Sequence, residues 1–284
     1  MNNEEIGFVF TNYNNTDFTL KLLLSIDKIS ELNVKNVVIV DNNSNLIEKN
    51  KLLKLKSKFQ FVELILNKKN LGYFAGLNCG IEKLRKKQIN CIIVGNNDLV
   101  FPNNFLKKLL NNSRLFNKYP VISPSIISID GVFQNPHVIN EISSFRKFIW
   151  DIYYSSYFMA KVVLFFSNIM NKVSKRQDVL QHDVEREILQ GYGACFILTP
   201  IFFKYFKKLW TPTFLMEEEF FLRTQIFTKN FKTLYCPDIS VTHHDHAAIN
   251  KIPKKTFWKI SKDAHIIYKK VRQNKIKYPE NLDT

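Results

Sequence analysis

Short apolar runs alternate with segments of helical periodicity over the first hundred residues. Between the runs, leucines recur at helical spacing, as at Leu20, Leu23 and Leu24. Short strands that are apolar on both faces and separated by helices are typical of a parallel sheet covered by helices on both sides. The pattern therefore predicts an α/β fold with a mostly parallel sheet. The expected strands are Ile6–Phe10, Val37–Val40, Phe61–Leu66 and Cys91–Val94.

The second half of the chain has a less regular pattern. We expect a strand over Leu189–Leu198 that contains a turn of small residues, a helix over Phe214–Phe227 and a last strand over Leu234–Val241. Phe145–Val173 is rich in Phe, Tyr, Ile and Met with interspersed Lys and Arg, which predicts one or two amphipathic helices. These expectations divide the chain into a domain over residues 1–246, with a helical insertion at about 145–180, and a basic, aromatic helical extension over residues 247–284.

The formal net charge of +16 requires an anionic neighbour, and nucleic acid, anionic lipid and phosphorylated small molecules all qualify. One interpretation is a basic, non-catalytic nucleic-acid-binding protein. Such a protein would combine basic and aromatic residues in one motif, such as an RNP or helix-turn-helix pattern, and the sequence contains neither. We therefore expect no nucleic acid as a partner.

The location of the protein is indicated by features that the sequence lacks. Its four cysteines show no C-x-x-C spacing, so they predict neither a zinc site nor a redox pair. The N-terminal residues MNNEEIGFVF do not have the basic region and long apolar core of a signal peptide. No apolar stretch reaches the length of about 18 residues that spans a bilayer. We expect a cytoplasmic protein, or one that rests on the cytoplasmic face of a membrane.

Polar residues follow the predicted strands at the sheet edge where ligands bind in such folds. Asp98 ends the sequence Gly-Asn-Asn-Asp and can hold Mg²⁺ or Mn²⁺, although the same residues also suit a turn. Asp41 follows the run VVIV. Its carboxylate can accept a hydrogen bond from a nucleotide base or a ribose hydroxyl, or it can cap a turn. The small residues of the loop NLGYFAG (70–76) permit close approach of a phosphate or sugar, and they equally suit a plain loop-to-helix junction.

Two further clusters offer proton transfer or ligation. The sequence Glu217-Glu218-Glu219 opens a predicted helix, where carboxylates complement the helix dipole. One of the three can instead point into a cleft and deprotonate an acceptor hydroxyl, because neighbouring like charges raise a carboxyl pKa. The histidines of His-His-Asp-His (243–246) can bind a metal or a phosphate, but their spacing is not that of a hydrolytic zinc site.

In this order, the motifs resemble those of the inverting family 2 glycosyltransferases with a GT-A fold, and most closely the bacterial rhamnosyltransferase-like branch. The resemblance extends from the first strand to about residue 246. The matching stretches are FVFTNYNN (8–15), VVIVDNNS (37–44), NLGYFAGLNCGI (70–81), GNNDLVFPNNFL (95–106), GYGACFIL (191–198), FLMEEEFFLR (214–223) and VTHHDH (241–246).

The resemblance implies a role for each site residue. Glu218 would be the general base, with Glu217 and Glu219 as the alternatives in register. Asp98, His243 and His246 would hold Mg²⁺ or Mn²⁺, although Asn96 replaces an aspartate that many members have in the metal motif. Gly193 and Ala194 would border the acceptor. The donor would contact Thr11, Tyr13, Asp41, Asn42, Asn70, Gly72, Asn78, Asn96 and Asn97.

The partners that the resemblance implies are a nucleotide-diphosphate sugar and a glycan or lipid-diphosphate-linked acceptor, in the synthesis of a bacterial surface polysaccharide such as O-antigen, lipooligosaccharide or capsule. The amphipathic stretch and the basic tail suit an anionic membrane, and the alternative is that they pack on the domain or pair two subunits. A rival enzyme class, the sugar-phosphate nucleotidyltransferases, has a Gly-rich basic loop after the first strand. This chain has Asn12-Tyr13-Asn14-Asn15 there.

Overall fold

A single mixed sheet forms the body of the protein. The computed structural model describes residues 6–30, 36–171, 181–244 and 254–282. Within them the strand order is β3-β2-β1-β4-β8-β6-β9-β5, and β7 pairs with β9. The bounds are β1 (Ile6–Asn12), β2 (Asn36–Asp41), β3 (Val62–Leu66), β4 (Cys91–Asn96), β5 (Leu99–Val100), β6 (Val121–Ser128), β7 (Arg186–Ile188), β8 (Cys195–Leu198) and β9 (Thr233–His243).

Strand direction divides the sheet into two parts. The first four strands are parallel to one another, as are β6 and β9. The short β8 lies between β4 and β6 and runs antiparallel to both, and β5 and β7 run antiparallel to β9. The predicted α/β fold with a mostly parallel sheet is therefore confirmed, and β8 joins its two parts.

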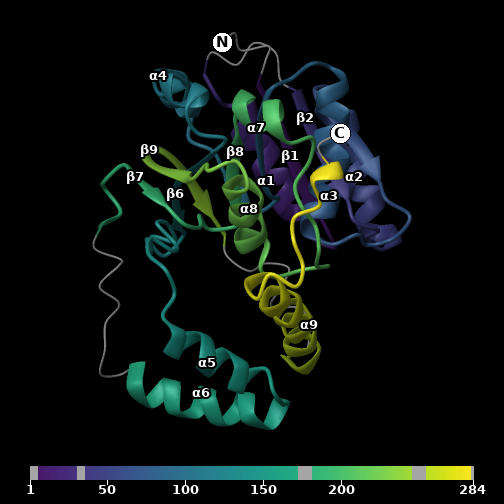
Figure 1. The fold of residues 1–284 in the computed structure, drawn as a ribbon. Coiled ribbons are helices and arrows are strands. Elements are labelled where there is room, and N and C mark those ends of the chain that lie inside the picture. Colours follow the sequence, from purple (N-terminus) through teal and green to yellow (C-terminus); the bar gives the residue numbers. More distant parts are fainter. Residues whose placement is uncertain (1–5, 31–35, 172–180, 245–253, 283–284) are drawn as a thin grey trace.

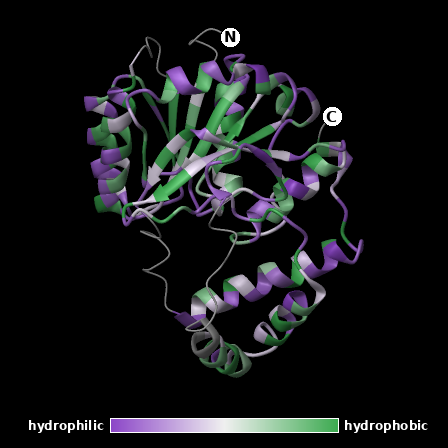
Figure 2. Cartoon of the chain, turned by 90° about the vertical axis from the view of Figure 1, so that its left-hand side faces the viewer, coloured by the Kyte–Doolittle hydropathy of each residue, from purple (hydrophilic) through white to green (hydrophobic). Residues whose placement is uncertain are grey.

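Helices cover both faces of the sheet (Figure 1). Successive side chains of a strand point to opposite faces, so Phe8 and Phe10 enter one core, whereas Val9 enters the other. Both faces need apolar side chains, which explains the uninterrupted apolar runs, and these strands are green in Figure 2. The covering helices are α1 (Thr16–Asp27), α2 (Leu46–Lys58), α3 (Tyr73–Lys86), α4 (Phe105–Asn111), α7 (Pro200–Tyr205) and α8 (Glu218–Phe227), with 3-10 turns at Ser113–Asn117 and Glu280–Leu282.

The helices α5 (Ser144–Tyr153) and α6 (Tyr157–Asn171) extend away from the sheet, and α9 (Lys254–Arg272) lies between them and the sheet (Figure 1). The Asp151 carboxylate of α5 is 2.9 Å from His265 Nε2 and 3.0 Å from Lys269 Nζ, both on α9. The same helix packs Tyr268 against Phe220 of α8, with ring centroids 4.5 Å apart. The C-terminal helix thus connects α5 to the body.

Two predicted elements differ from the structure. The strand expected over Leu189–Leu198 is shorter in the structure, where only β8 (Cys195–Leu198) is a strand, because a turn around the glycines at 191 and 193 precedes it. The helix expected from Phe214 begins only at Glu218, since Met216 and Glu217 have left-handed backbone angles, with φ of 76° and 66°. A helix cannot pass through two consecutive residues in that conformation.

Candidate active site

The carboxyl ends of β1, β2 and β4 meet at one edge of the sheet. The register pairs Asn12 with Asp41 across β1 and β2, and Thr11 with Asn96 across β1 and β4. This pairing brings together the polar residues that follow the three strands. The predicted location of a site at these strand ends therefore coincides with a real cluster of polar side chains.

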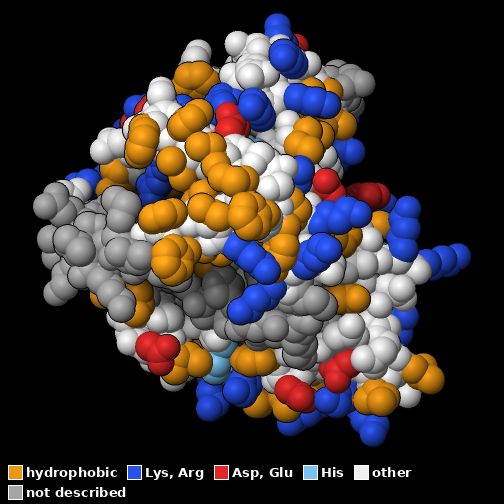
Figure 3. Space-filling view, turned by 90° about the horizontal axis from the view of Figure 1, so that it is seen from below, with side chains coloured by type: hydrophobic (Ala, Val, Ile, Leu, Met, Phe, Trp, Pro, Cys, Tyr) orange, Lys and Arg blue, Asp and Glu red, His pale blue; other side chains and the backbone are white. Residues whose placement is uncertain are grey.

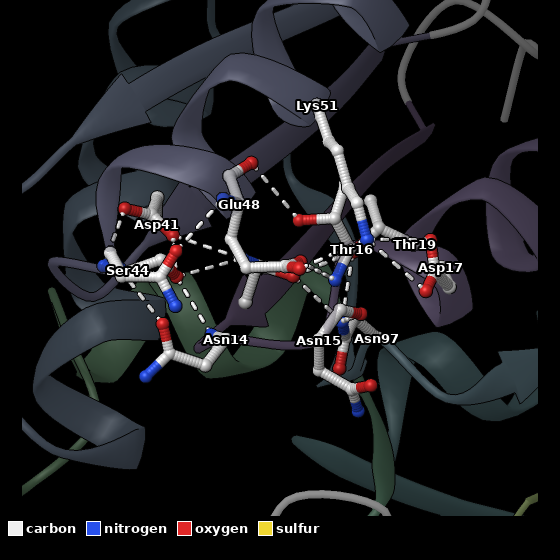
Figure 4. A network of polar contacts seen from close by, with 12 residues as sticks. Asn14, Asn15, Thr16, Asp17, Thr19, Asp41, Ser44, Glu48, Lys51 and Asn97 are labelled. Carbon is white, nitrogen blue, oxygen red and sulfur yellow. Dashed lines mark hydrogen bonds and ion pairs between the residues drawn. The ribbon is translucent and has the colours of Figure 1, made fainter.

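Much of this cluster is a buried network that holds the strand ends together (Figure 4). Asn97 Nδ2 lies 3.0 Å from Asn12 Oδ1 and 2.8 Å from Thr19 Oγ1, to both of which it donates. Asn12 Nδ2 in turn donates to Asp41 at 2.9 Å and to Ser44 Oγ at 3.1 Å. The backbone N–H of Ser44 also donates to Asp41, at 2.9 Å. This geometry gives Asp41 the turn-capping role, and its contact with a nucleoside stays a prediction.

Two more residues that are predicted to contact the donor, Asn42 and Asn78, form hydrogen bonds within the protein. Asn42 Nδ2 donates to the carbonyl of Gly72 at 2.9 Å, and its Oδ1 accepts from Asn67 at 3.0 Å. Asn78 lies on α3, and both ends of its amide bond the backbone of Leu209, at 2.8 and 2.9 Å. Asn78 therefore joins α3 to the segment before α8, and its predicted role at the sugar has no support in this geometry.

Among the other predicted donor residues, Thr11 and Tyr13 lie at the carboxyl end of β1, and Asn70 and Gly72 lie in the turn before α3. Tyr13 is 45% exposed beyond the end of β1, and Thr11 is half-buried. The side chain of Asn70 accepts from the Gly72 N–H at 2.9 Å, which stabilises the turn before α3. Gly72 has a φ of 89°, and a Cβ there would lie 1.8 Å from the carbonyl oxygen of Phe214, so only glycine fits.

Asp98 and His243 form the part of the site that suits a metal. The short β5 pairs with the end of β9, which places the buried Asp98 beside the buried His243, with Oδ1 and Nε2 3.1 Å apart. His243 Nδ1 lies 2.8 Å from Gln134 Oε1. Because an amide oxygen only accepts, Nδ1 donates to Gln134, and Nε2 is the ring nitrogen that faces Asp98.

This pair fits a divalent cation. Asp98 Oδ1 is buried within ion-pair distance of His243 but accepts no hydrogen bond from the described residues. A carboxylate and an imidazole fixed by an outer hydrogen bond are common metal ligands. In the part of the chain that the structure describes, no group of three His, Cys, Asp or Glu side chains could hold a metal. His246, the third predicted ligand, lies outside the described residues.

The turn before β8 connects this pair to the three glutamates. The ring of Tyr192 lies 6.0 Å from that of His243, edge to face. The next residue, Gly193, donates its N–H to Glu219 Oε1 at 2.9 Å, and a Cβ there would lie 2.4 Å from the same oxygen. Ala194 then accepts from the N–H of Asn96 at 3.0 Å. The candidate metal ligands and the glutamates thus border one site.

The three glutamates have different surroundings. Glu219 is held by Gly193, and Glu217 occupies the strained position before α8. Glu218 is the first residue of α8, and its Oε1 is buried without a hydrogen-bond partner among the described residues. Burial, and then the charge of Glu219, raises the pKa of Glu218 well above its usual value and that of Glu217 to about 7. A carboxylate of raised pKa whose oxygen is not engaged has the properties of a general base.

Tyr73 is a site residue that the sequence did not indicate. Its hydroxyl donates to the carbonyl of Gly193 at 2.7 Å. Burial raises the pKa of Tyr73 well above its usual value, and the negative charges of Glu218, Glu219 and Asp98 act in the same direction. Tyr73 and Glu219 therefore contact the same residue of the turn before β8, Gly193. Gln134 was missed as well, since it lies in an irregular loop with no motif.

The model of the glycosyl transferase family 2 matches residues 8–173. A mannosyltransferase from Pyrobaculum calidifontis, solved with GDP-Man and Mn²⁺, is similar to the chain with a TM-score of 0.57 and 12% identity, over 98% of this chain and 67% of that one. GalNAc-T7, solved with UDP, GalNAc and Mn²⁺, is similar with a TM-score of 0.54 and 14% identity over 84% of this chain. The chain spans only 42% of the GalNAc-T7 chain.

No curated protein sequence matches the chain at a significant level. At such low identities the two solved structures establish the fold alone, which agrees with the expected GT-A type. The family model covers more than half of the chain, from β1 to the end of α6. The chain therefore belongs to glycosyl transferase family 2.

Proposed function

We propose that the protein transfers a sugar from a nucleotide diphosphate to an acceptor hydroxyl with inversion, and that Glu218 is the general base. The observation that carries this proposal is the turn Tyr192–Ala194, which contacts His243 on one side and Glu219 on the other. This turn supports the proposal because it contacts a proposed metal ligand, His243, and the neighbour of the proposed base, Glu219.

Glu218 accepts the proton of the acceptor hydroxyl, and the oxygen attacks the anomeric carbon as the bond to the diphosphate breaks on the opposite face. Asp98 and His243 are the residues that would hold Mg²⁺ or Mn²⁺, whose charge would stabilise the departing diphosphate. Both similar solved structures contain Mn²⁺ with a nucleotide or nucleotide sugar, which supports a divalent ion here. Tyr73 holds the carbonyl of Gly193, whose N–H donates to Glu219.

Glu218→Gln tests the assignment, because the amide keeps the shape of the side chain and cannot accept the proton. We expect turnover to fall by at least about 100-fold, the lower end of what general-base catalysis supplies, with donor affinity unchanged. Parallel Glu217→Gln and Glu219→Gln variants identify the base if the register is different. The exposed Glu82, paired with Lys86, gives a matched control in Glu82→Gln. Unchanged turnover in Glu218→Gln would refute the role of this residue.

We further propose that the acceptor is a glycan or a lipid-diphosphate-linked sugar of a bacterial surface polysaccharide, reached at the cytoplasmic face of the membrane. The sequence resemblance to the rhamnosyltransferase-like branch supports this acceptor class. No helix in the described part of the chain is long and apolar enough to cross a bilayer. Contact with the membrane would therefore have to be made by a surface of the protein.

The outer face of the α5–α6 hairpin has the composition of such a surface. Apolar side chains gather in the view from below, edged by Lys and Arg (Figure 3). Asp151, the one acidic residue of these helices, faces α9 instead. A surface of aromatic and basic side chains is complementary to an anionic bilayer. Its large exposed side chains are Phe145, Phe148, Phe158, Leu164, Phe165 and Phe166.

Co-sedimentation with vesicles tests this surface. We expect binding to phosphatidylglycerol vesicles that weakens with salt, and that weakens by about tenfold for each of Phe145→Ser and Phe158→Ser, which are 73% and 72% exposed. Leu46→Ser, equally exposed on α2, is the matched control. Binding that is indifferent to anionic lipid would contradict the proposal. If the same two substitutions instead dissociate a dimer, the hairpin pairs two subunits.

A further inference from the structure

The charged contacts between α5 and α9 all meet at one carboxylate. Asp151 Oδ1 lies 2.9 Å from His265 Nε2. Its Oδ2 lies 3.0 Å from Lys269 Nζ and 3.7 Å from Arg272 Nη2. Asp151 is the only acidic residue of α5, and no side chain of this helix is buried. The attachment of α5 to α9 is therefore sensitive to the charges around Asp151.

Aromatic rings complete this junction between the α5–α6 hairpin and α9. Tyr154, which follows α5, stacks on the ring of His265 with centroids 4.5 Å apart. Tyr157 of α6 meets Trp258 of α9 edge to face, with centroids 5.5 Å apart. A cavity of about 320 Å³ lies beside Tyr154 and His265, so the junction is not tightly packed. A junction of this kind can separate without disturbing the core of the sheet.

His265 is buried, and only one of its ring nitrogens has a partner. Its exposed fraction is 3%. Burial raises the pKa of Asp151, but the hydrogen bonds from His265 and Lys269 outweigh burial, and the pKa lies below its usual value. Asp151 is therefore ionised at neutral pH, and a carboxylate only accepts, so His265 Nε2 is the donor. His265 Nδ1 is buried and has no hydrogen-bond partner among the described residues.

A second proton on this ring would weaken the junction. It would sit on Nδ1 as a buried N–H without an acceptor, which is costly. It would also bring a third positive charge to Asp151, which already faces Lys269 and Arg272. Burial lowers the pKa of His265, the charges of Arg272 and Lys269 act in the same direction, and Asp151 offsets only part of this effect. Separation of α5 from α9 would let water solvate the protonated ring.

The other ionisable groups near the ring do not relieve this conflict. Lys270 and Lys275 line the cavity beside His265, and both are positive. Tyr154 and Tyr268 contact the ring, at 4.5 and 5.4 Å between centroids. Burial raises the pKa of both tyrosines, and the charge of Glu217, before α8, acts in the same direction. Both tyrosines are therefore neutral, and cations outnumber carboxylates around the ring.

We propose that Asp151 and His265 form a pH-sensitive latch, which holds the α5–α6 hairpin on α9 while the His265 ring is neutral and releases it when the ring is protonated in mild acid. The latch has its full strength above about pH 6.5, the usual pKa of histidine, and weakens as the pH falls below that value. It does not depend on the proposed sugar transfer. It determines how firmly the proposed membrane surface is attached to the rest of the protein.

Hydrogen exchange of the full-length protein at pH 7.5 and pH 5.0, with neither donor nor lipid present, tests the latch. A helix of 10 residues is unstable on its own, so the amides of α5 lose protection when the hairpin is released. After correction for the intrinsic exchange rates, we expect their protection factors to fall by about three- to tenfold in acid, since a pKa difference of one corresponds to a factor of ten. The amides of β4 in the sheet are the internal reference and should change less.

Three variants assign the effect to the latch. His265→Gln keeps a donor near the position of Nε2 but does not titrate, so the protection of α5 should be the same at both pH values. His182→Gln is the matched control, because this histidine stacks on Phe133 outside the junction, and the acid response should remain. Asp151→Asn should lower the protection of α5 at pH 7.5 to the level that the wild type reaches in acid. Because the Asp151 side chain is 26% exposed, this variant keeps the test valid if His265→Gln does not fold.

Three results would each overturn the proposal. The first is equal protection of α5 in the wild type at both pH values. The second is an acid response that persists in His265→Gln. The third is unchanged protection of α5 in Asp151→Asn at pH 7.5. None of these results bears on sugar transfer or on vesicle binding, because the measurement contains neither a donor nor a membrane.

Discussion

The substitution Glu217→Gln is expected to stabilise the protein in neutral and alkaline buffer while leaving its stability in acid unchanged. Burial and the charge of Glu219 raise the pKa of Glu217 from an ordinary 4.5 to about 7 in the folded protein. Between these values the folded protein holds a proton that the unfolded chain has lost. The wild type therefore loses stability as the pH rises from 4.5 through 7, and a glutamine does not.

The size of the effect follows from the two pKa values. A difference of one in pKa corresponds to 1.36 kcal/mol, so the step from 4.5 to about 7 corresponds to about 3 kcal/mol. The entropy of unfolding of a 284-residue chain is on the order of 600 cal/mol/K, which converts this free energy into roughly 5 °C of melting temperature. The gain is absent below pH 4.5 and complete above pH 7.

Urea denaturation of both proteins at pH 4.5 and pH 8.5, in EDTA, measures this difference. Glutamine has almost the shape of glutamate and the same difficulty with the left-handed backbone at this position, so the comparison isolates the charge. Glu82→Gln, at an exposed pair with Lys86, is the control and should change stability little at either pH. The raised pKa of Glu217 would be refuted if the substitution changed the unfolding free energy equally at both pH values. It would also be refuted if the variant were less stable than the wild type at pH 8.5.

Three further predictions concern single residues of the site. Gly72→Ala should lower the free energy of unfolding by at least about 2 kcal/mol in urea titrations, because its Cβ would meet the Phe214 carbonyl at a positive φ; a neutral result contradicts that approach. Asn12→Ala should cost about 2–4 kcal/mol in the same assay, since it leaves Asp41, Thr19 and Asn97 short of partners, and a loss below 1 kcal/mol would mean that the network rearranges. Gln134→Ala should weaken Mn²⁺ binding by about 10- to 100-fold in calorimetric titrations without loss of fold, because the His243 ring loses the group that orients it; unchanged affinity would show that His243 is no ligand.

The sequence allows the parallel half of the sheet to be predicted because its strands are apolar on both faces. Val37–Val40 and Cys91–Val94 lie within observed strands for that reason. The extent of β8 could not be predicted, since the sequence shows a turn of small residues within Leu189–Leu198 but does not show that the strand begins only after it, at Cys195. Helix α8 begins later than predicted because Met216 and Glu217 have left-handed backbone angles, and no local sequence pattern predicts that conformation.

The position of the candidate site could be predicted from the sequence, whereas the roles of its residues stay predictions. Strand ends with polar residues locate it, and the pairing of Asp98 with His243 follows from β5 and β9 being adjacent, which only the fold reveals. Asparagines are ambiguous in sequence because an amide can bind a ligand or replace a backbone partner with equal ease. Asn78 and Asn97 both form hydrogen bonds with segments far away in the chain, and their contacts with the donor stay predictions.

The position of β8 links catalysis to the completion of folding. This strand fills the gap between β4 and β6, and the residues just before it hold Glu219 and face His243. A nascent chain that has produced only its first four strands contains the asparagine-rich edge but neither the proton acceptor nor the histidine. Under the proposed function, competence for sugar transfer and closure of the sheet would arise in the same assembly step.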